Sequence, residues 1–178
     1  MSRDLKTIMA EAEKGDELAL IELATAYFNG EVNGRTEIGN GLECMEKAAK
    51  KGNPKIQHQC GVLYKELGLH ETAFKWYMEA ALNNHADSQA MVASYYYTDL
   101  AGEKDEKKAF KWAKLAYENG EECEAPTLLG VMYCLGRATK QDIIEGYKML
   151  RIAASKGNET AAEYKAALEK DYPMLKKL

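Results

Sequence analysis

The stretch from Ala125 to Gly157, APTLLGVMYCLGRATKQDIIEGYKMLRIAASKG, contains two short apolar segments separated by a polar loop. In the first segment, Gly130 follows a leucine and stands three residues before Tyr133, a spacing that places the two on neighbouring faces of one helix. In the second segment, Gly146 and Ala153 stand eleven and four residues before the final glycine. Small residues at such spacings let two helices approach closely. The stretch therefore predicts a pair of packed helices.

Turns equivalent to the one at Gly157 recur along the chain. Their central residues are Gly15, Gly52, Asn84, Gly120 and Gly157, and the separations are 37, 32, 36 and 37 residues. Periods of this length are typical of stacked helix pairs. Glycine or asparagine suits the left-handed residue that ends a helix, and we expect Asp16, Asn53 and Asn158 to cap the helices that follow.

The residues between the turns form columns with matching side chains. In the first helix of each pair, an apolar residue precedes a small one, at Leu23-Ala24, Cys60-Gly61, Val92-Ala93 and Leu129-Gly130, and Tyr27, Tyr64, Tyr96 or Tyr133 follows three residues after the small one. In the second helix the columns are small (Gly41, Ala73, Ala109, Gly146), then bulky (Cys44, Trp76, Trp112, Met149), then alanine (Ala48, Ala80, Ala116, Ala153). We expect these columns, including both tryptophans, to pack in the core. Because Tyr96 then holds a packing position, Tyr97 is expected to be the exposed neighbour.

Composition restricts the class of protein. The 178 residues are 46% hydrophobic with three prolines, which favours helices, and they carry a formal net charge of -4 without a basic cluster. Nucleic acid is therefore not an expected partner. Charged residues interrupt the first twelve positions, and no apolar run is long enough to cross a membrane. These features predict a cytoplasmic protein that does not bind membranes and whose four cysteines are reduced.

The chain resembles the Sel-one-like repeat (SLR) family, a branch of the tetratricopeptide-like (TPR) proteins. Leu129 to Gly136 is similar to the family's Leu-Gly-x-x-Tyr-x-x-Gly, and Ile152 to Gly157 to its closing Ala-Ala-x-x-Gly. The resemblance implies an all-α fold, a right-handed α-α superhelix (solenoid) of about four SLR/TPR-like helix pairs with terminal capping helices. Residues 1–178 would form a single domain. It divides into an N-terminal helix (1–15), four repeats (16–52, 53–84, 85–120 and 121–157) and a C-terminal capping helix (158–178).

Some details depart from the family pattern. The second repeat is short, and Leu67 to His70 replaces the glycine-containing loop, while the first repeat has a long connector from Gly30 to Gly39. Some SLR proteins pair cysteines eight residues apart, but Cys123 and Cys134 are eleven apart. The exported, disulfide-linked subgroup is therefore a poor match. Whether Cys44 and Cys60 lie close enough to pair stays open.

No catalytic motif is present in the sequence. It contains no phosphate-binding loop, nucleophile elbow or zinc-protease motif, so we expect no enzyme and no cofactor. His58 and Cys60 come nearest to a metal constellation with Cys44, but both cysteines occupy core positions and we assign them to packing. A β-lactamase or penicillin-binding type of enzyme, an activity attributed to some secreted relatives, lacks its Ser-x-x-Lys pair here.

The resemblance implies a protein-interaction module or adaptor that binds a protein or peptide on its concave surface. In this family the first helix of each pair forms most of that surface. The family's ligand-facing positions fall here on Ile21, Thr25, Phe28, Asn29, His58, Val62, Lys65, Glu66, Ala90, Ser94, Tyr97, Thr98, Thr127, Val131, Cys134 and Leu135. The partner-binding candidates are Phe28, Asn29, His58, Lys65, Ser94, Tyr97, Val131 and Leu135. Such a wall suits a peptide with an apolar anchor. We expect a monomer or weak homo-oligomer, and a structural self-associating oligomer is the remaining alternative.

Overall fold

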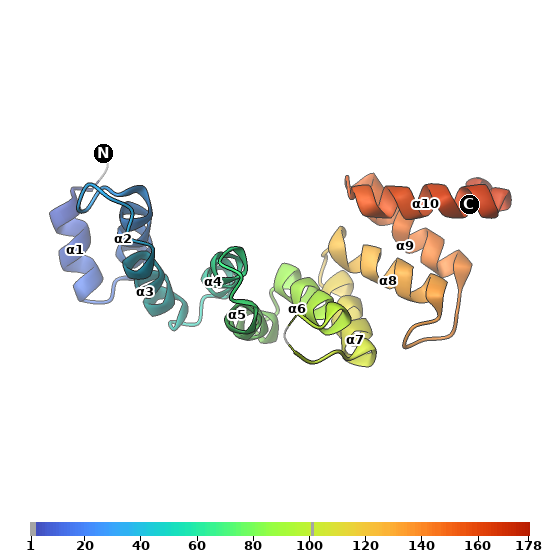
Figure 1. Ribbon diagram of the computed structural model, residues 1–178, viewed down its shortest axis with the longest axis horizontal. Coiled ribbons are helices and arrows are strands. Elements are labelled where there is room, and N and C mark those ends of the chain that lie inside the picture. The colour runs from blue at the N-terminus through green and yellow to red at the C-terminus, as the bar shows by residue number, and fades with distance from the viewer. Residues whose placement is uncertain (1–2, 101) are drawn as a thin grey trace. The chain divides into compact units, whose positions relative to one another are not determined.

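The computed structural model describes residues 3–100 and 102–178, and these residues form α-helices without a strand (Figure 1). The helices are α1 (Leu5–Glu13), α2 (Glu17–Asn29), α3 (Ile38–Ala49), α4 (Pro54–Glu66), α5 (His70–Leu82), α6 (Ala86–Thr98), α7 (Glu106–Glu118), α8 (Glu124–Leu135), α9 (Ile143–Ser155) and α10 (Glu159–Asp171), followed by the 3-10 helix η1 (Pro173–Lys177). The all-α class and the helix pairs predicted from the sequence are confirmed.

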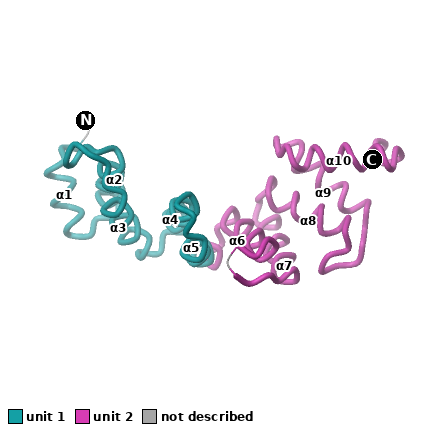
Figure 2. Tube along the Cα trace, in the orientation of Figure 1, with its two compact units in different colours: residues 1–80 teal, residues 81–178 magenta. Residues whose placement is uncertain are grey.

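The chain forms two compact units, Met1–Ala80 and Ala81–Leu178, which Figure 2 distinguishes by colour. Unit 1 holds α1 and the pairs α2/α3 and α4/α5, with the last residues of α5 beyond its end. Unit 2 holds the pairs α6/α7 and α8/α9, followed by α10 and η1. The repeat boundaries and a single domain spanning residues 1–178 stay predictions.

The predicted turns and caps are present. All five turn centres have left-handed backbones, with φ of 82° at Gly15, 93° at Gly52, 60° at Asn84, 92° at Gly120 and 91° at Gly157. This conformation is open to glycine and tolerated by asparagine, so the chain reverses there at little steric cost.

The predicted helix caps also form. The side chains of Asp16, Asn53 and Asn158 accept hydrogen bonds from backbone N–H groups in the first turns of α2, α4 and α10. Pro54 occupies the first turn of α4, where its missing N–H leaves no helical bond unmade. Each cap satisfies a donor that the helix itself leaves without a partner.

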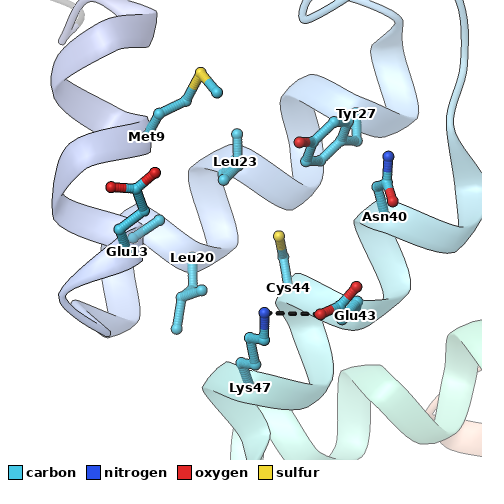
Figure 3. A pocket seen from close by; sticks show the side chains of 10 residues that line it. Met9, Glu13, Leu20, Leu23, Tyr27, Asn40, Glu43, Cys44 and Lys47 are labelled. Atoms are coloured by element: carbon cyan, nitrogen blue, oxygen red, sulfur yellow. Dashed lines mark ion pairs between the residues drawn. The ribbon is translucent and has the colours of Figure 1, made fainter.

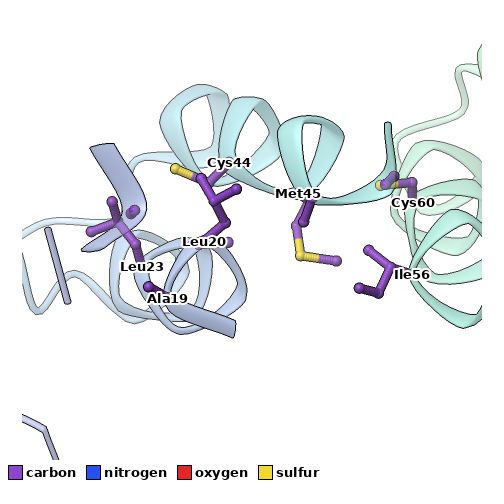
Figure 4. Packing of buried hydrophobic residues seen from close by; sticks show 11 residues of the cluster. Ala19, Leu20, Leu23, Cys44, Met45, Ile56 and Cys60 are labelled. Carbon is purple, nitrogen blue, oxygen red and sulfur yellow. The ribbon is translucent and has the colours of Figure 1, made fainter. Parts of the chain in front are cut away.

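The core of unit 1 is a continuous cluster that runs through α2, α3 and α4. Figure 4 shows its members, with Leu20 and Leu23 from α2, Met45 from α3 and Ile56 and Cys60 from α4. All of these side chains are buried because each helix turns one apolar stripe toward the next helix.

Small residues set the closeness of the helices in unit 1. Gly41 of α3 lies directly against the ring of Phe28, and a Cβ on Gly61 of α4 would meet the ring of Tyr77 at 2.6 Å. Any side chain at these positions would displace an aromatic ring from the core. The predicted small-residue columns therefore do serve as contact points between helices.

The core of unit 2 includes a crossing of two bare backbones. A Cβ on Gly146 of α9 would lie 2.8 Å from the carbonyl oxygen of Gly130 in α8 and 3.1 Å from the backbone nitrogen of Cys134. Leu150 is fully buried beside this crossing. The two glycines that first indicated a helix pair thus lie at its closest approach.

In the bulky column of the second helices, Cys44 is buried as predicted, but Trp76, Trp112 and Met149 are only partly buried, which corrects the sequence analysis. Trp76 and Trp112 pack against the core clusters but keep part of their surface exposed. The residues that follow each of them, Tyr77 and Ala113, are 0% exposed. Successive positions on an α-helix differ by about 100° in direction, so the centre of the buried stripe lies one residue beyond the predicted column.

The three consecutive tyrosines of α6 also differ from expectation. Tyr95 is fully buried, whereas Tyr96 and Tyr97 are both half-buried. The ring of Tyr96 lies under the ammonium group of Lys108, with 5.0 Å from Nζ to the ring centre. The packing position assigned to Tyr96 therefore belongs to Tyr95, and Tyr96 forms a cation–π contact at the edge of the core instead.

Candidate functional site

In unit 1, the face formed by the first helices, α2 and α4, carries an open hollow of about 370 Å³. Its lining residues come from three helices: Ile21, Thr25 and Phe28 of α2, Met45 of α3, and Gln59, Val62, Leu63 and Glu66 of α4. The lining is mostly apolar, with one carboxylate at the C-terminal end of α4. A second hollow, between α1 and α2, shares Ile21 and Thr25 with it, so the two are adjacent.

In unit 2, the first helices form a comparable hollow of about 240 Å³. Its lining consists of Ala90, Ser94 and Tyr97 of α6, Glu124, Thr127, Leu128 and Val131 of α8, and Thr160 and Tyr164 of α10. We call it the α6–α8–α10 groove. The contribution of α10 was not anticipated, because the sequence analysis treated that helix only as a cap.

Four of the eight partner-binding candidates line these hollows. Phe28 lies in the hollow of unit 1, and Ser94, Tyr97 and Val131 lie in the α6–α8–α10 groove. Phe28 also fills the space beside Gly41, so its ring is part of the core as well as of the surface. A substitution at Phe28 would therefore change stability and surface together.

The other four candidates do not line either of these two hollows. The ring of His58 lies 5.4 Å from that of Tyr77, centre to centre, so it faces α5, and its neighbour Gln59 lines the hollow instead. The exposed side chain of Asn29 donates a hydrogen bond to Glu31.

Lys65 and Leu135 are exposed near the C-terminal ends of α4 and α8 and are not among the residues that line these two hollows. Binding at these four positions stays a prediction. Which side chain of a helix reaches a hollow depends on how that helix is rotated in its pair, and the family offsets do not include this rotation.

Unit 1 carries further hollows that include residues of α1 or of the second helices. Figure 3 shows one of about 200 Å³ between α1, α2 and α3, where Lys47 and Glu43 form an ion pair of 2.8 Å. Cys44 lies beside this pair, and burial raises the pKa of its thiol. A thiol held in its protonated form is a poor nucleophile, so this hollow lacks an activated cysteine.

The four cysteines show neither a disulfide bond nor a metal site in the described part of the chain. All four are free, and Figure 4 shows Cys44 and Cys60 separated along the core of unit 1. Burial raises the pKa of Cys60 to about 12. Within residues 3–100 and 102–178, no group of three His, Cys, Asp or Glu side chains is placed to hold a metal ion.

One structural carboxylate was missed by the sequence analysis. Glu121 is buried, and its Oε1 accepts hydrogen bonds of 2.9 Å from the backbone N–H groups of Cys123 and Glu124, while Oε2 accepts one from Ala125. It therefore caps α8, the central helix of the α6–α8–α10 groove. The signal was available, because an acidic residue directly follows the turn glycine Gly120.

The folded chain is a helical-repeat protein, since helix pairs with small-residue contact columns recur at a nearly constant period. The family model of the Sel1 repeat matches residues 18–53, 70–85, 86–121 and 124–158, which is well over half of the chain. The chain belongs to the Sel1 repeat family. Proteins of this family are generally protein-interaction modules and typically non-enzymatic scaffolds.

Solved structures with the same fold are distant in sequence. The protective antigen c5321 of uropathogenic Escherichia coli, which displays an SLR fold, is 24% identical with a TM-score of 0.76, and the match covers 90% of this chain and 35% of that protein. A Sel1 repeat protein from Oxalobacter formigenes is 23% identical with a TM-score of 0.74, covering 91% of this chain and 68% of that one. The Helicobacter pylori cysteine rich protein B is 17% identical with a TM-score of 0.51, covering 69% and 96%. These likenesses establish the fold alone, and the chain spans about a third of the length of the E. coli antigen.

The helices of the described residues were also compared with the requirements of a bilayer. Each is too short or too polar to serve as a membrane span.

Proposed function

We propose that this chain is a protein-interaction module that holds a peptide segment of a partner protein on the face formed by its first helices. The observation that carries the proposal is the position of the two hollows. They open at matching positions of successive first helices, with Thr25 and Val62 lining one and Ser94 and Val131 lining the other.

The chemistry of the two hollows suits a peptide. Aliphatic and aromatic side chains line each of them, and hydroxyl or amide groups stand among these. Apolar anchors supply most of the binding energy in such complexes, while hydroxyls and amides accept or donate hydrogen bonds to an extended backbone. The hollows also lie on helices rather than loops, which keeps their shape fixed before a partner arrives and reduces the entropy lost on binding.

The free cysteines support a cytoplasmic location, which we include in the proposal, because a reducing compartment keeps such thiols unpaired. A catalytic role gains no support from the buried thiols, since burial holds Cys44 and Cys60 in their protonated form. These observations favour binding of a protein partner over catalysis.

Site-specific photo-crosslinking in the native cell tests the proposal. The photoreactive residue p-benzoylphenylalanine would replace Thr25, Ser94 or Tyr97 on the first-helix face, and the exposed Lys111 of α7 as the matched control on the second-helix face. We expect a defined crosslinked protein from the groove positions and a much weaker band from Lys111. Crosslinking that is equal or stronger at Lys111 would place the partner elsewhere and refute the proposal.

A further inference from the structure

The helices around the α6–α8–α10 groove carry an uneven distribution of charge. Asp87 is the one charged residue of α6, and Glu124 the one charged residue of α8. The second helices of the same unit are basic: α7 carries four lysines against two glutamates, and α9 carries Lys148 and Arg151 against Glu145. Among α6 to α9, the cationic side chains thus lie on the second helices. The third groove helix, α10, carries two lysines against four carboxylates.

Carboxylates pair with three cations on or next to the helices of the groove. Arg137, just beyond α8, is 2.5 Å from Glu106, Lys156 is 2.5 Å from Glu122, and Lys165 of α10 is 2.8 Å from Glu169. Such pairing leaves little positive potential to repel a cationic ligand.

Glu124 is in a different situation, because it lines the groove and is exposed to solvent. Its Oε1 accepts a hydrogen bond of 3.2 Å from the amide of Asn158. An amide donor is neutral, so this bond orients the carboxylate without cancelling its charge. This negative charge lies at the N-terminal end of α8. The apolar part of the groove lining includes Leu128, Val131 and the half-exposed ring of Tyr164.

From this arrangement we propose that the α6–α8–α10 groove selects peptides in which a lysine or arginine accompanies an apolar or aromatic anchor. The anchor seats against Leu128, Val131 and Tyr97, and the basic side chain reaches Glu124. Aromatic rings such as those of Tyr97 and Tyr164 pack against apolar side chains and also bind cations over their faces. They therefore favour a ligand that has both an apolar anchor and a basic side chain. The inference rests on the proposed function and adds the chemistry of the partner.

The test begins with a phage library of random dodecapeptides selected against the full chain. An enriched peptide is then synthesised with a fluorescein label, together with a copy in which each Lys or Arg is replaced by Gln, and affinities are measured by fluorescence polarisation. We expect Glu124→Gln, which keeps an oxygen acceptor for Asn158, to weaken the basic peptide about threefold and the neutral copy hardly at all. Glu118→Gln, an exposed residue of α7, is the matched control and should change neither.

A blocking variant shows whether the peptide uses this groove. Thr160 is an exposed groove residue, so Thr160→Arg should abolish binding without disturbing the core, while the exposed Ala162→Arg on a different face of α10 should leave binding intact. Circular dichroism of each variant checks that the helices persist.

The outcomes separate the inference from the proposed function. Peptides that are blocked by Thr160→Arg but show no basic preference, or no difference between Glu124→Gln and the native chain, overturn the inference and leave the proposed function standing. An absence of enriched peptides, or binding that Thr160→Arg does not affect, overturns both. Light scattering tests whether a second copy of the chain occupies the groove. A dimer that dissociates in Thr160→Arg would assign the groove to self-association and overturn the inference.

Discussion

Gly146→Ala should destabilise unit 2 even though alanine is the better helix former. The added Cβ would lie 2.8 Å from the carbonyl oxygen of Gly130 and 3.1 Å from the backbone nitrogen of Cys134. Both contacts are with backbone, which cannot rotate away, so α8 and α9 must separate. Overpacking of this kind costs about 3 kcal/mol at its upper range, and the gain in helix propensity returns about 1 kcal/mol. The expected net loss is about 2 kcal/mol.

Urea unfolding followed by tryptophan fluorescence measures this loss unit by unit. The chain has two tryptophans, one in each unit, so a Trp76→Phe background makes Trp112 the reporter of unit 2. With a denaturant slope of about 2 kcal/mol per molar urea, a loss of about 2 kcal/mol lowers the midpoint by about 1 M.

The matched control is Gly39→Ala in α3, where an added Cβ meets nothing within 4 Å. Read through Trp76 in a Trp112→Phe background, it should leave the midpoint unchanged or raise it slightly. An unchanged or higher midpoint for Gly146→Ala would refute the close approach of α8 and α9 at these two glycines.

Three further predictions concern the core and its caps. Glu121→Ala should lower the unfolding free energy by about 1 to 2 kcal/mol, measured by urea denaturation, because the first N–H groups of α8 lose their acceptor; no loss would show that water replaces the cap. Leu150→Ala should lower the unfolding free energy by about 3 kcal/mol, because Leu150 is 0% exposed. Trp112→Ala should lower it by less than the roughly 3 to 5 kcal/mol of a fully buried tryptophan, because Trp112 is half-buried. A full loss at Trp112 with little loss at Leu150 would contradict the assigned burial. Stability should fall as pH rises above about 9, since unfolded thiols ionise there while Cys60 stays protonated until about pH 12. The raised folded-state pKa thus stabilises the fold at lower pH and loses its effect in alkali, and Cys60→Ala should reduce this slope in urea titrations at pH 8 and pH 10.5.

The repeat was predictable because it rests on local chemistry. A left-handed backbone favours glycine or asparagine, so Gly52 and Asn84 could be identified without any knowledge of tertiary contacts. The caps at Asp16 and Asn158 follow from the same local rule.

The position of individual side chains around a helix was less predictable. His58 and Gln59 are adjacent, and which of them reaches the hollow depends on how α4 is rotated against α5, where His58 meets Tyr77. Trp112 and Ala113 present the same ambiguity. Sequence spacing defines an apolar stripe about two residues wide, and only the packing of neighbouring helices selects its centre.

The α6–α8–α10 groove was foreseen in part. All its α6 residues and Thr127 and Val131 of α8 occupy expected positions, but Glu124 and Leu128 were not expected there. Thr160 and Tyr164 belong to a helix with no partner of its own in the repeat pattern. In the sequence, α10 is recognisable only as a helix that covers the end of the core. Its role in the groove follows from its position beside α8, which the sequence pattern does not give.

The alanine column of the second helices has a consequence for evolution and engineering. Ala48, Ala80, Ala116 and Ala153 are each 0% exposed, and a larger side chain in such a closely packed core is generally destabilising. Ser94 and Thr160 line the groove and do not belong to this alanine column. A designer could therefore rewrite the ligand preference of the chain by recombining outward-facing positions while keeping the scaffold alanines constant, and natural drift is free to follow the same route.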